Sequence, residues 1–427
     1  MRAYPAMKNT GVAWLGSIPV DWDLVRLKNI ATVRTGSTPK GNDGVNVDEL
    51  GYKWFTPSDS GTGTNLNSAG KYIDEKSVKK YKIQLFQPDS ILFTGIGKVG
   101  VVGITNDLAY SNQQITAVSP TNIDSKFLFY VLNNSTESLS KIAPSTMLPI
   151  VNNRLLLVTP IALPDSIQQK KIAAYLDAET AKIDHLISKQ EKLLGLLEEK
   201  RRATITSAVT TGLKMNATFK QTNIPWLGNV PIHWRLEKLK YVGQTIIGLT
   251  YSPSDLSDEG TMVLRSMNIA GGRINTDTQI FVSKKIPEKL LTREGDLLIC
   301  SRNGSRKLIG KCGLIQKSQE GLTFGVFNTV YRSKHNKYVY YVLNSNIFYA
   351  QLGLFMTSTI NQLTVNTLNN FEIALPPENE QMEIVTYLNR FENELDSLKQ
   401  KVELQISLLK ERRVSLILNV VTGKVKV

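Results

Sequence analysis

The sequence predicts an α+β protein in which two mixed, mainly β domains alternate with two long helices. Three observations support this fold class. The same order of motifs occurs twice along the chain. The first part of each copy is rich in β-branched residues, glycine, asparagine and serine, and the second part has apolar residues at helical spacing. We therefore expect an approximate internal twofold relation between two halves of one polypeptide.

The repeat rests on two separate pairs of motifs. Residues 12–22 are echoed by residues 224–234, and residues 162–177 by residues 374–389, both at an offset of 212 residues. Near the end of each copy the offset falls to 211, so the second helix is expected to be one residue shorter. Gene duplication explains this pattern, whereas a solenoid would need more and shorter repeats.

The first part of each copy is expected to form a globular domain. Short runs of β-forming residues, such as 90–94 and 296–300, predict strands. Residues 125–133 and 338–346 predict helices, so these domains are mixed rather than purely β. The expected boundaries are 1–164 for the first domain, 165–212 for the central helix, 213–376 for the second domain and 377–427 for the C-terminal helix.

The second part of each copy predicts a long helix with a coiled-coil seam. Prolines precede both segments at Pro164 and Pro376, and glycines follow them at Gly212 and Gly423, which are typical start and stop signals. The apolar residues of the two expected seams are Ile172, Leu176, Ile183, Leu186, Leu193 and Leu197 in the first helix and Ile384, Leu388, Leu395, Leu398, Val402 and Leu409 in the second.

Charge and composition favour a nucleic-acid partner. The chain has 51 Lys and Arg against 37 Asp and Glu, a net charge of +14, which attracts polyanions. A basic surface kept for solubility is the alternative. No apolar run is long enough to cross a membrane, and two cysteines, Cys300 and Cys312, make no disulfide framework. We expect a cytoplasmic protein without membrane contact.

The duplicated motifs resemble the specificity (S) subunits of type I restriction-modification systems. Each copy contains Trp-Leu-Gly-x-x-Pro-x-x-Trp, then a variable domain, then Leu-Pro, a helix start rich in Gln or Glu, and Thr-Gly. Tyr-Leu-Asp and Lys-Arg-Arg occur in the first copy, with close variants in the second. The resemblance covers essentially the whole chain. It implies two target-recognition domains joined by two antiparallel helices.

The resemblance also implies partners: double-stranded DNA, two methyltransferase (M) subunits and, in the full enzyme, two translocase-nuclease (R) subunits. The chain itself would perform no chemistry and need no cofactor. A helix of about 40 residues is about 60 Å long, so a helix pair could set the distance between two DNA readers. We therefore expect a bipartite site with two short half-sites and an unread gap.

Motifs that suggest catalysis fail on their context. Gly95–Gly100 formally matches GxGxxG, but a strand rather than a helix is expected after it, so we interpret it as a β-turn. Asp165 and Glu198 lie about 50 Å apart along one helix, too far to share a metal ion. We interpret Asp165 as a helix N-cap and Glu198 as solvated surface. The three histidines are too scattered for a metal cluster or a triad.

Candidate DNA contacts are polar, basic or aromatic residues in expected loops of the two domains, because Asn and Gln suit adenine edges and Lys and Arg suit guanine or phosphate. In the first domain they are Arg34, Ser37, Thr38, Lys40, Lys53, Trp54, Ser58, Lys98, Asn112, Gln113 and Gln114. In the second they are Tyr251, Arg265, Ser266, Arg302, Asn303, Arg306, Lys307, Lys311, Asn328 and Arg332. Trp54 and Gln113 could equally be core or turn residues. For Lys307 and Lys311 we favour phosphate contacts.

A second function remains open at this stage. The same pattern fits a coiled-coil scaffold whose β domains bind protein and have no DNA specificity. Salt-dependent binding of duplex DNA would distinguish the two functions, because neutralising several phosphates makes affinity fall steeply with salt.

Overall fold

The computed structural model describes residues 3–46, 51–59, 64–97, 99–143, 150–214, 216–355 and 362–427. The chain divides into two compact units. Unit 1 comprises Met1–Glu191 and Glu403–Val427, and unit 2 comprises Lys192–Val402. Each unit therefore combines one β-rich segment with part of each long helix, and the two units are described separately.

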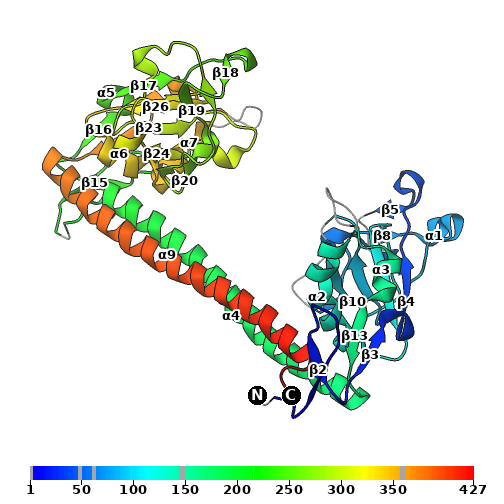
Figure 1. Cartoon of the computed structure of the whole chain (residues 1–427). Helices are drawn as coiled ribbons and strands as arrows, with labels where there is room; N and C mark the ends of the chain where they lie inside the picture. The colour runs from blue at the N-terminus through cyan, green and yellow to red at the C-terminus, as the bar shows by residue number, and fades with distance from the viewer. Residues whose placement is uncertain are drawn as a thin grey trace. The chain divides into compact units, whose positions relative to one another are not determined.

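The core of unit 1 is a five-stranded sheet faced by helix α2 (Ser125–Ile142) (Figure 1). In spatial order its strands are β4 (Ala31–Thr35), β12 (Ile115–Pro120), β9 (Ile91–Thr94), β10 (Gly100–Thr105) and β7 (Asn65–Leu66). A second sheet contains β11 (Tyr110–Ser111), β6 (Tyr52–Phe55), β8 (Tyr72–Ile73) and β5 (Val45–Asn46), and the short helix α1 (Glu75–Tyr81) follows β8. The short helix α3 (Asn153–Val158) packs against β4 of the main sheet. The expected α+β character is confirmed.

Unit 2 repeats this arrangement. Its main sheet contains, in spatial order, β17 (Gln244–Ile247), β26 (Asn328–Arg332), β23 (Leu297–Cys300), β24 (Cys312–Leu314), β21 (Arg273–Ile274) and β20 (Ile269–Ala270). The second sheet contains β18 (Leu256–Ser257), β22 (Phe281–Val282), β19 (Thr261–Leu264) and β25 (Thr323–Phe324). Its helices are α5 (Leu239–Val242), α6 (Asn336–Leu343), α7 (Asn346–Phe355) and α8 (Val365–Asn369).

Each unit also has two small ribbons that mark the repeated motifs. The first ribbon is formed by β1 (Met7–Asn9) and β2 (Ser17–Pro19) in unit 1, and by β14 (Phe219–Gln221) and β15 (Asn229–Pro231) in unit 2. The second ribbon is formed by β3 (Asp23–Arg26) and β13 (Pro160–Leu163) in unit 1, and by β16 (Arg235–Lys238) and β27 (Glu372–Leu375) in unit 2. All four pairings are antiparallel and agree with the 212-residue offset.

The central strands form because they are apolar on both faces. All four residues of β9 and of β23 are buried, which explains why they read as continuous apolar runs in the sequence. The expected helices are present as α2 and α6. Asp124 caps α2 by accepting a hydrogen bond from the backbone N–H of Phe127 at 2.9 Å, so the helix starts where the strand-forming run ends.

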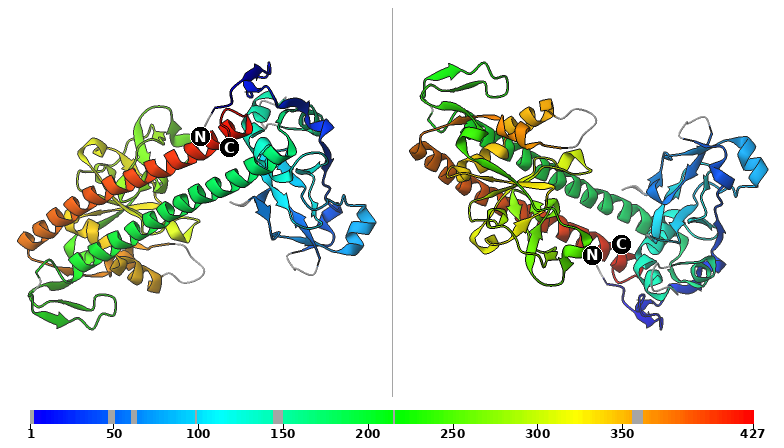
Figure 2. Two further views of the ribbon diagram at one scale, coloured as in Figure 1. Left: turned by 90° about the horizontal axis from the view of Figure 1, so that it is seen from below. Right: turned by 90° about the horizontal axis from the view of Figure 1, so that it is seen from above.

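The two long helices are α4 (Ser166–Thr210, 45 residues) and α9 (Glu378–Val421, 44 residues). The one-residue difference agrees with the drop in offset, and the two helices run side by side in the three ribbon views (Figures 1 and 2). Asp165 caps α4 by accepting from the N–H of Gln168 at 2.9 Å, as expected. Gly212 and Gly423 follow with φ of +73° and +69°, the left-handed conformation that ends a helix.

The helices pair antiparallel within each unit. In unit 2, Glu198 accepts from Lys399 at 2.8 Å, while Arg201, further along α4, donates to Glu392, which lies earlier on α9. The expectation that Glu198 is merely solvated surface is wrong: it bridges the two helices, because Lys399 and two arginines on its own helix surround it. In unit 1 the pair is linked by Arg413 and Asp184 at 2.9 Å.

The seams are largely as expected, with one correction repeated in both helices. Most expected seam residues are buried, and Leu193 and Leu409 are half-buried. Leu186 and Leu398 instead are 46% and 42% exposed. They occupy equivalent positions in the two copies, and a strict heptad drifts around a straight 3.6-residue helix, so both point away from the partner helix.

Candidate nucleic-acid interface

The candidate interface of unit 1 lies at one end of its main sheet. Because neighbouring strands are antiparallel, β4 and β9 end there while β12 and β10 begin there. We call residues 35–38, 56–59, 94–97 and 112–115 the first loop edge. Backbone hydrogen bonds hold its loops together: Gly36 N to Ile115 O at 2.9 Å, Ser37 N to Ser111 O at 3.0 Å, Asn112 N to Phe55 O at 3.2 Å and Val151 N to Gly95 O at 2.8 Å.

Unit 2 builds an equivalent end of its sheet, formed by residues 247–251, 265–268, 300–311 and 325–328, which we call the second loop edge. The same four kinds of bond recur there: Gly248 N to Asn328 O at 3.2 Å, Leu249 N to Phe324 O at 2.7 Å, Gly325 N to Leu264 O at 3.0 Å and Leu363 N to Ser301 O at 2.7 Å. The two domains have little sequence in common, yet the same pattern of backbone hydrogen bonds holds the loops of both.

The close approach of the first loops requires glycine in both units. A Cβ on Gly36 would lie 2.5 Å from the carbonyl oxygens of Ser111 and Asn112. A Cβ on Gly248 would lie 2.3 Å from the oxygen of Gly325. A larger residue could not be accommodated at either position unless the backbone moved. These glycines therefore allow each loop to pack closely against the neighbouring backbone where it leaves the sheet.

The side chains on the first loop edge are mostly polar. Ser37 and Thr38 are half-buried, Thr38 hydrogen-bonds Gln113, and Asn112 donates to Gln114 at 3.0 Å. Ser58, Gln113 and Gln114 are exposed. Six of the residues selected from the sequence are therefore brought together: Ser37, Thr38, Ser58, Asn112, Gln113 and Gln114.

The remaining candidates of unit 1 are differently situated. Arg34 on β4 and Lys40 beyond the first loop are both exposed beside this edge. Lys53 is paired with Asp107 at 2.6 Å and lies two residues before the end of β6. Trp54 is only 3% exposed and belongs to the core, because it packs in a cluster with Ile73 and Tyr110. Lys98 lies outside the described residues.

The second loop edge carries more charge. Arg302 is exposed and its guanidinium lies 6.0 Å from the centre of the Phe327 ring. Asn303 donates to the hydroxyl of Ser266 at 3.0 Å, which ties two loops together. The other candidates found on this edge are half-buried Tyr251, Arg265 and Lys311 and exposed Arg306 and Lys307.

Two candidates of unit 2 need correction. Asn328 is 1% exposed, because it donates inward to the carbonyl oxygen of Leu264 at 3.4 Å. Arg332 lies at the opposite end of β26 and makes hydrogen bonds of 2.8 and 2.6 Å to the carboxylate of Asp296. Its charge is compensated inside the domain, so Arg332 is a structural residue.

The sequence interpretation missed the exposed apolar residues of the second loop edge, above all the two most exposed. Met267 and Phe327 are 57% and 56% exposed although both are large and apolar. The sequence favours polar, basic and some aromatic residues as DNA contacts, because large apolar residues are usually found in the core. Phe327 lies in the turn just before β26, so its side chain is exposed although the strand residues 328–331 are buried, and no composition rule reveals this.

A tyrosine connects each β-rich segment to the long helices. Tyr130 donates to Asp177 of α4 at 2.7 Å, and Tyr341 donates to Asn389 of α9 at 2.6 Å. Burial raises the pKa of Tyr130 to about 12, so it remains a hydrogen-bond donor. These tyrosines occupy equivalent positions and anchor each sheet, through its helix, to the helix pair of its own unit.

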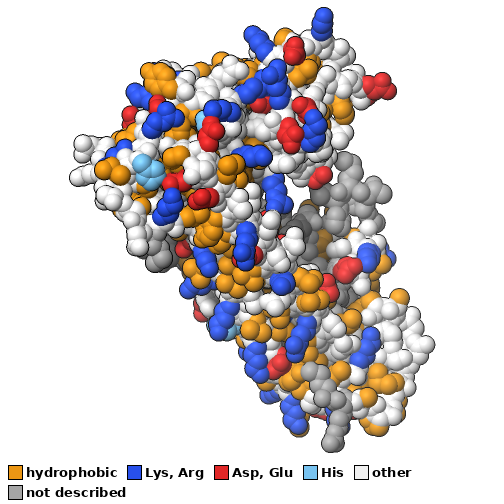
Figure 3. All heavy atoms as spheres, turned by 90° about the vertical axis from the view of Figure 1, so that its left-hand side faces the viewer, with side chains coloured by type: hydrophobic (Ala, Val, Ile, Leu, Met, Phe, Trp, Pro, Cys, Tyr) orange, Lys and Arg blue, Asp and Glu red, His pale blue; other side chains and the backbone are white. Residues whose placement is uncertain are grey.

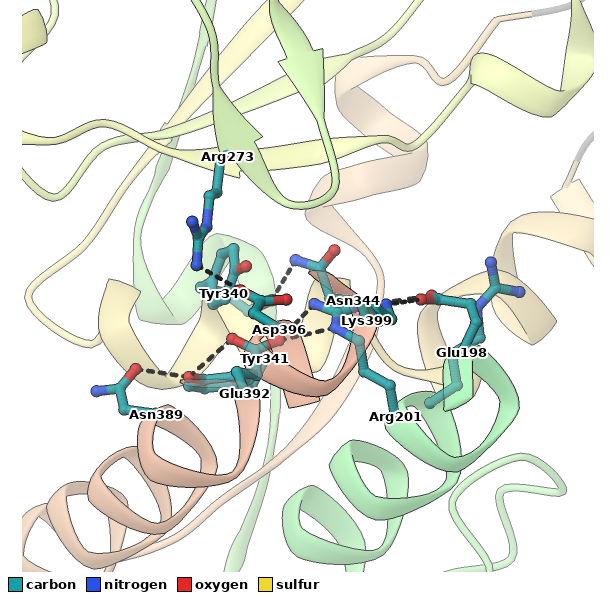
Figure 4. A network of polar contacts seen from close by, with 11 residues as sticks. Glu198, Arg201, Arg273, Tyr340, Tyr341, Asn344, Asn389, Glu392, Asp396 and Lys399 are labelled. Atoms are coloured by element: carbon teal, nitrogen blue, oxygen red, sulfur yellow. Dashed lines mark hydrogen bonds and ion pairs between the residues drawn. The ribbon is translucent and has the colours of Figure 1, made fainter. Parts of the chain in front are cut away.

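Unit 2 surrounds its tyrosine with charge, as Figure 4 shows. Glu392 of α9 contacts Tyr341 at 3.3 Å and accepts from Nε of Arg201 of α4 at 2.9 Å. Arg273 of β21 reaches Asp396 of α9 at 2.6 Å. Arg201 and Glu392 are 12% and 17% exposed, so this pair is nearly desolvated. The orientation of the sheet on its helices is thereby tied to specific side chains.

A second anchor lies at the helix starts. Trp22 donates its indole N–H to Gln168 at 2.9 Å, and Trp234 donates to Glu380 at 2.8 Å. Burial alone would raise the pKa of Glu380, but hydrogen bonds from Lys214, Trp234 and His233 lower it to about 2. This explains the paired tryptophans of the repeat and gives His233 a structural role, as expected.

Basic residues are widely distributed. In the space-filling view of one face, Lys and Arg side chains are spread over the surface with apolar side chains between them (Figure 3). Across the described residues, no group of three His, Cys, Asp or Glu side chains could hold a metal ion. No described helix is long and apolar enough to cross a membrane.

The chain is similar to several known proteins. The family described as "Type I restriction modification DNA specificity domain" matches residues 19–194 and 231–407. The type I restriction enzyme MjaVIII specificity subunit of Methanocaldococcus jannaschii is 25% identical over 424 residues, covering 96% of this chain and 94% of that protein. The putative MjaX specificity subunit of the same organism is 26% identical, covering 97% and 96%.

A solved chain has a similar fold. It comes from a structure concerned with complex assembly and conformational transition of the type I R-M system, with a TM-score of 0.71 and 17% identity. The match covers 96% of this chain and 99% of that chain. Since the family match repeats in both copies and takes in most of the sequence, the chain belongs to the type I restriction modification DNA specificity domain family.

Proposed function

We propose that this chain is the DNA-recognition subunit of a type I restriction-modification enzyme and that each loop edge reads one half of a bipartite duplex site. One observation carries the proposal: both loop edges use the same backbone hydrogen bonds but present different side chains. A repeated scaffold with exchanged side chains is what two readers of different sequences require, because base identity is read by side chains at base edges.

The reading residues differ in chemistry between the two edges. On the first edge, Asn112, Gln113 and Gln114 offer amides that match adenine. On the second, Arg302 offers the fork that matches guanine, while Lys307 and Lys311 are suited to phosphates. The complete proposed set is Arg34, Ser37, Thr38, Lys40, Lys53, Ser58, Lys98, Asn112, Gln113 and Gln114 together with Tyr251, Arg265, Ser266, Arg302, Asn303, Arg306, Lys307 and Lys311.

The long helices would set the spacing and dock the methyltransferase subunits. Several large apolar side chains on α4 and α9 are more than 40% exposed in this chain, among them Leu186, Leu196, Leu398 and Leu408. Exposed apolar residues of this kind on a helix favour a protein partner. The functional division into 1–164, 165–212, 213–376 and 377–427 follows from these roles.

The chemistry would belong to the partners: two methyltransferase subunits and, in the full enzyme, two translocase-nuclease subunits. The chain would bring DNA to them without cofactor or metal of its own. The cysteines, Cys300 and Cys312, are buried free thiols, which suits the reducing cytoplasm proposed as its location.

Salt-dependent binding tests the proposal. The chain, assembled with its methyltransferase subunits, should bind duplex DNA with an affinity that falls steeply with salt, and Lys307→Gln should reduce the slope of log K against log salt by about 1. Lys289, an exposed lysine before β23 begins, supplies the matched control, since Lys289→Gln should leave the slope unchanged. Salt-independent or absent DNA binding would favour the protein-binding scaffold instead.

A further inference from the structure

The described part of the second loop edge carries four exposed large apolar side chains, Ile247, Met267, Val326 and Phe327, of which Met267 and Phe327 are the most exposed, whereas that of the first edge carries Ile96. Met267 and Phe327 are 57% and 56% exposed, whereas the equivalent positions of the first edge carry Ser58 and Gln114. Both edges fold with the same backbone hydrogen bonds, so the scaffold does not require apolar residues there. Single exposed apolar residues are common on proteins, but these two lie on loops that contact the basic segment 302–311, and apolar side chains grouped in this way mark a surface that a partner covers.

Both side chains stand on loops that are firmly held. The carbonyl oxygen of Phe327 accepts hydrogen bonds from the backbone N–H groups of Ser301 and Arg302 at 3.0 and 2.9 Å. Met267 lies in a short 3-10 helix, Ser266–Asn268, closed by Asn268, whose side chain accepts from Arg265 N at 2.9 Å. Side chains on such loops can contact a surface without a large loss of backbone entropy.

The neighbouring residues indicate the kind of surface. The guanidinium of Arg302 lies 6.0 Å from the Phe327 ring centre, and the loop that continues from Arg302 carries Arg306, Lys307 and Lys311. A phosphate backbone near these cations would bring a DNA groove to the apolar pair. In the major groove, the only apolar group on an unmodified base is the C5-methyl of thymine.

We propose that Met267 and Phe327 are specificity-determining residues that recognise the C5-methyl group of a thymine in the half-site read by unit 2. This inference rests on the proposed function and adds the base chemistry of one half-site. It also predicts a difference between the halves, because Ser58 and Gln114 offer hydrogen bonds instead of an apolar contact at the same positions of unit 1.

The test replaces thymine by uracil, which removes only the methyl group. The half-site of unit 2 is first identified by mapping methylation by the assembled methyltransferase. Each thymine of that half-site, on either strand, is then replaced singly, and binding of the complex is measured by fluorescence anisotropy. Loss of one buried methyl should weaken binding about fourfold at one position. The other positions should change little.

Variants then assign the effect to the residues. Phe327→Ala and Met267→Ala should weaken binding to thymine DNA, and one of them should abolish the difference between thymine and uracil. Tyr241→Ala is the matched control: Tyr241 is 72% exposed on α5, which precedes β17 and so lies away from the loop edge, and the difference should persist.

Two results would overturn the inference. The first is that every uracil-substituted duplex binds as tightly as the thymine duplex. The second is that the half-site read by unit 2 contains only G·C pairs. Retention of the full thymine preference by both alanine variants would overturn it as well. Failure of the proposed function gives a different result, namely no preference for any duplex sequence with thymine or uracil.

Discussion

Replacing Glu380 by glutamine should remove a pH-dependent part of the stability of unit 2. The carboxylate of Glu380 is held by Lys214, His233 and Trp234 at 2.8, 3.0 and 2.8 Å. Its pKa is lowered from 4.5 to about 2, and its side chain is only 11% exposed. At 1.36 kcal/mol for each unit of pKa, the lowered pKa corresponds to about 3 kcal/mol.

The direction of the pH dependence follows because protonation of Glu380 is coupled to unfolding. Because the folded pKa lies below the unfolded one, the contribution is complete above pH 4.5 and is lost as the pH falls towards 2. Glu380→Gln should therefore lower the free energy of unfolding by about 3 kcal/mol at pH 7. At pH 3.5 the difference between the native chain and the variant should shrink to about 2 kcal/mol.

The assay is urea unfolding of the full chain at both pH values, followed by tryptophan fluorescence. Gln168, which accepts from Trp22 in unit 1, provides a matched neutral control. Gln168→Ala should cost about 1 kcal/mol at either pH, because no charge is involved. The reasoning is refuted if the cost of Glu380→Gln is the same at pH 7 and pH 3.5.

Three further predictions concern the helices. Arg201→Met should lower the free energy of unfolding by about 3 kcal/mol or more in urea titrations, because it leaves the buried carboxylate of Glu392 unpaired. Adding Glu392→Leu should recover most of the lost stability, since no unpaired buried charge then remains. A double variant that is as unstable as the single variant would contradict this reasoning. Gly195→Ala should raise the free energy of unfolding by about 0.5–1 kcal/mol, since the added Cβ meets nothing within 4 Å. Gly212→Ala should lower the free energy of unfolding, since φ at this position is +73°. Changes of the same sign in the two variants, measured by thermal unfolding, would be evidence against this reasoning. Four residues inserted after Lys189, about one turn, should lengthen the unread gap by roughly two base pairs in methylation maps, while two residues should abolish assembly; an unchanged gap would show that the helices do not set the spacing.

The repeat made the fold largely predictable. Two motif pairs with one offset predicted the duplicated architecture, the helix caps at Asp165 and the glycine stops, all of which depend on local sequence. What local sequence does not contain is the pairing of distant segments. The exposure of Leu186 and Leu398 and the bridging role of Glu198 both depend on the other helix, which lies about 200 residues away in the chain.

The candidate interface was predictable in location but less so in membership. Several polar residues that the sequence places in loops do lie in exposed loops, as Gln113 and Arg302 show. Which residues next to a loop point outwards depends on packing against distant segments, so Trp54 and Asn328 are buried while Phe327 is exposed. Arg332 was misassigned because its partner, Asp296, becomes a neighbour only through pairing of β26 with β23.

The most direct test of the account is the map of modified bases produced by the complex of this chain with its methyltransferase subunits, measured before and after residues 25–160 are exchanged for those of another family member. The account predicts a bipartite motif with an unread gap, of which only one half changes on exchange while the other half and the gap remain. A contiguous motif, a motif independent of this chain, or a change in both halves would contradict the claim that two separate loop edges each read one half-site.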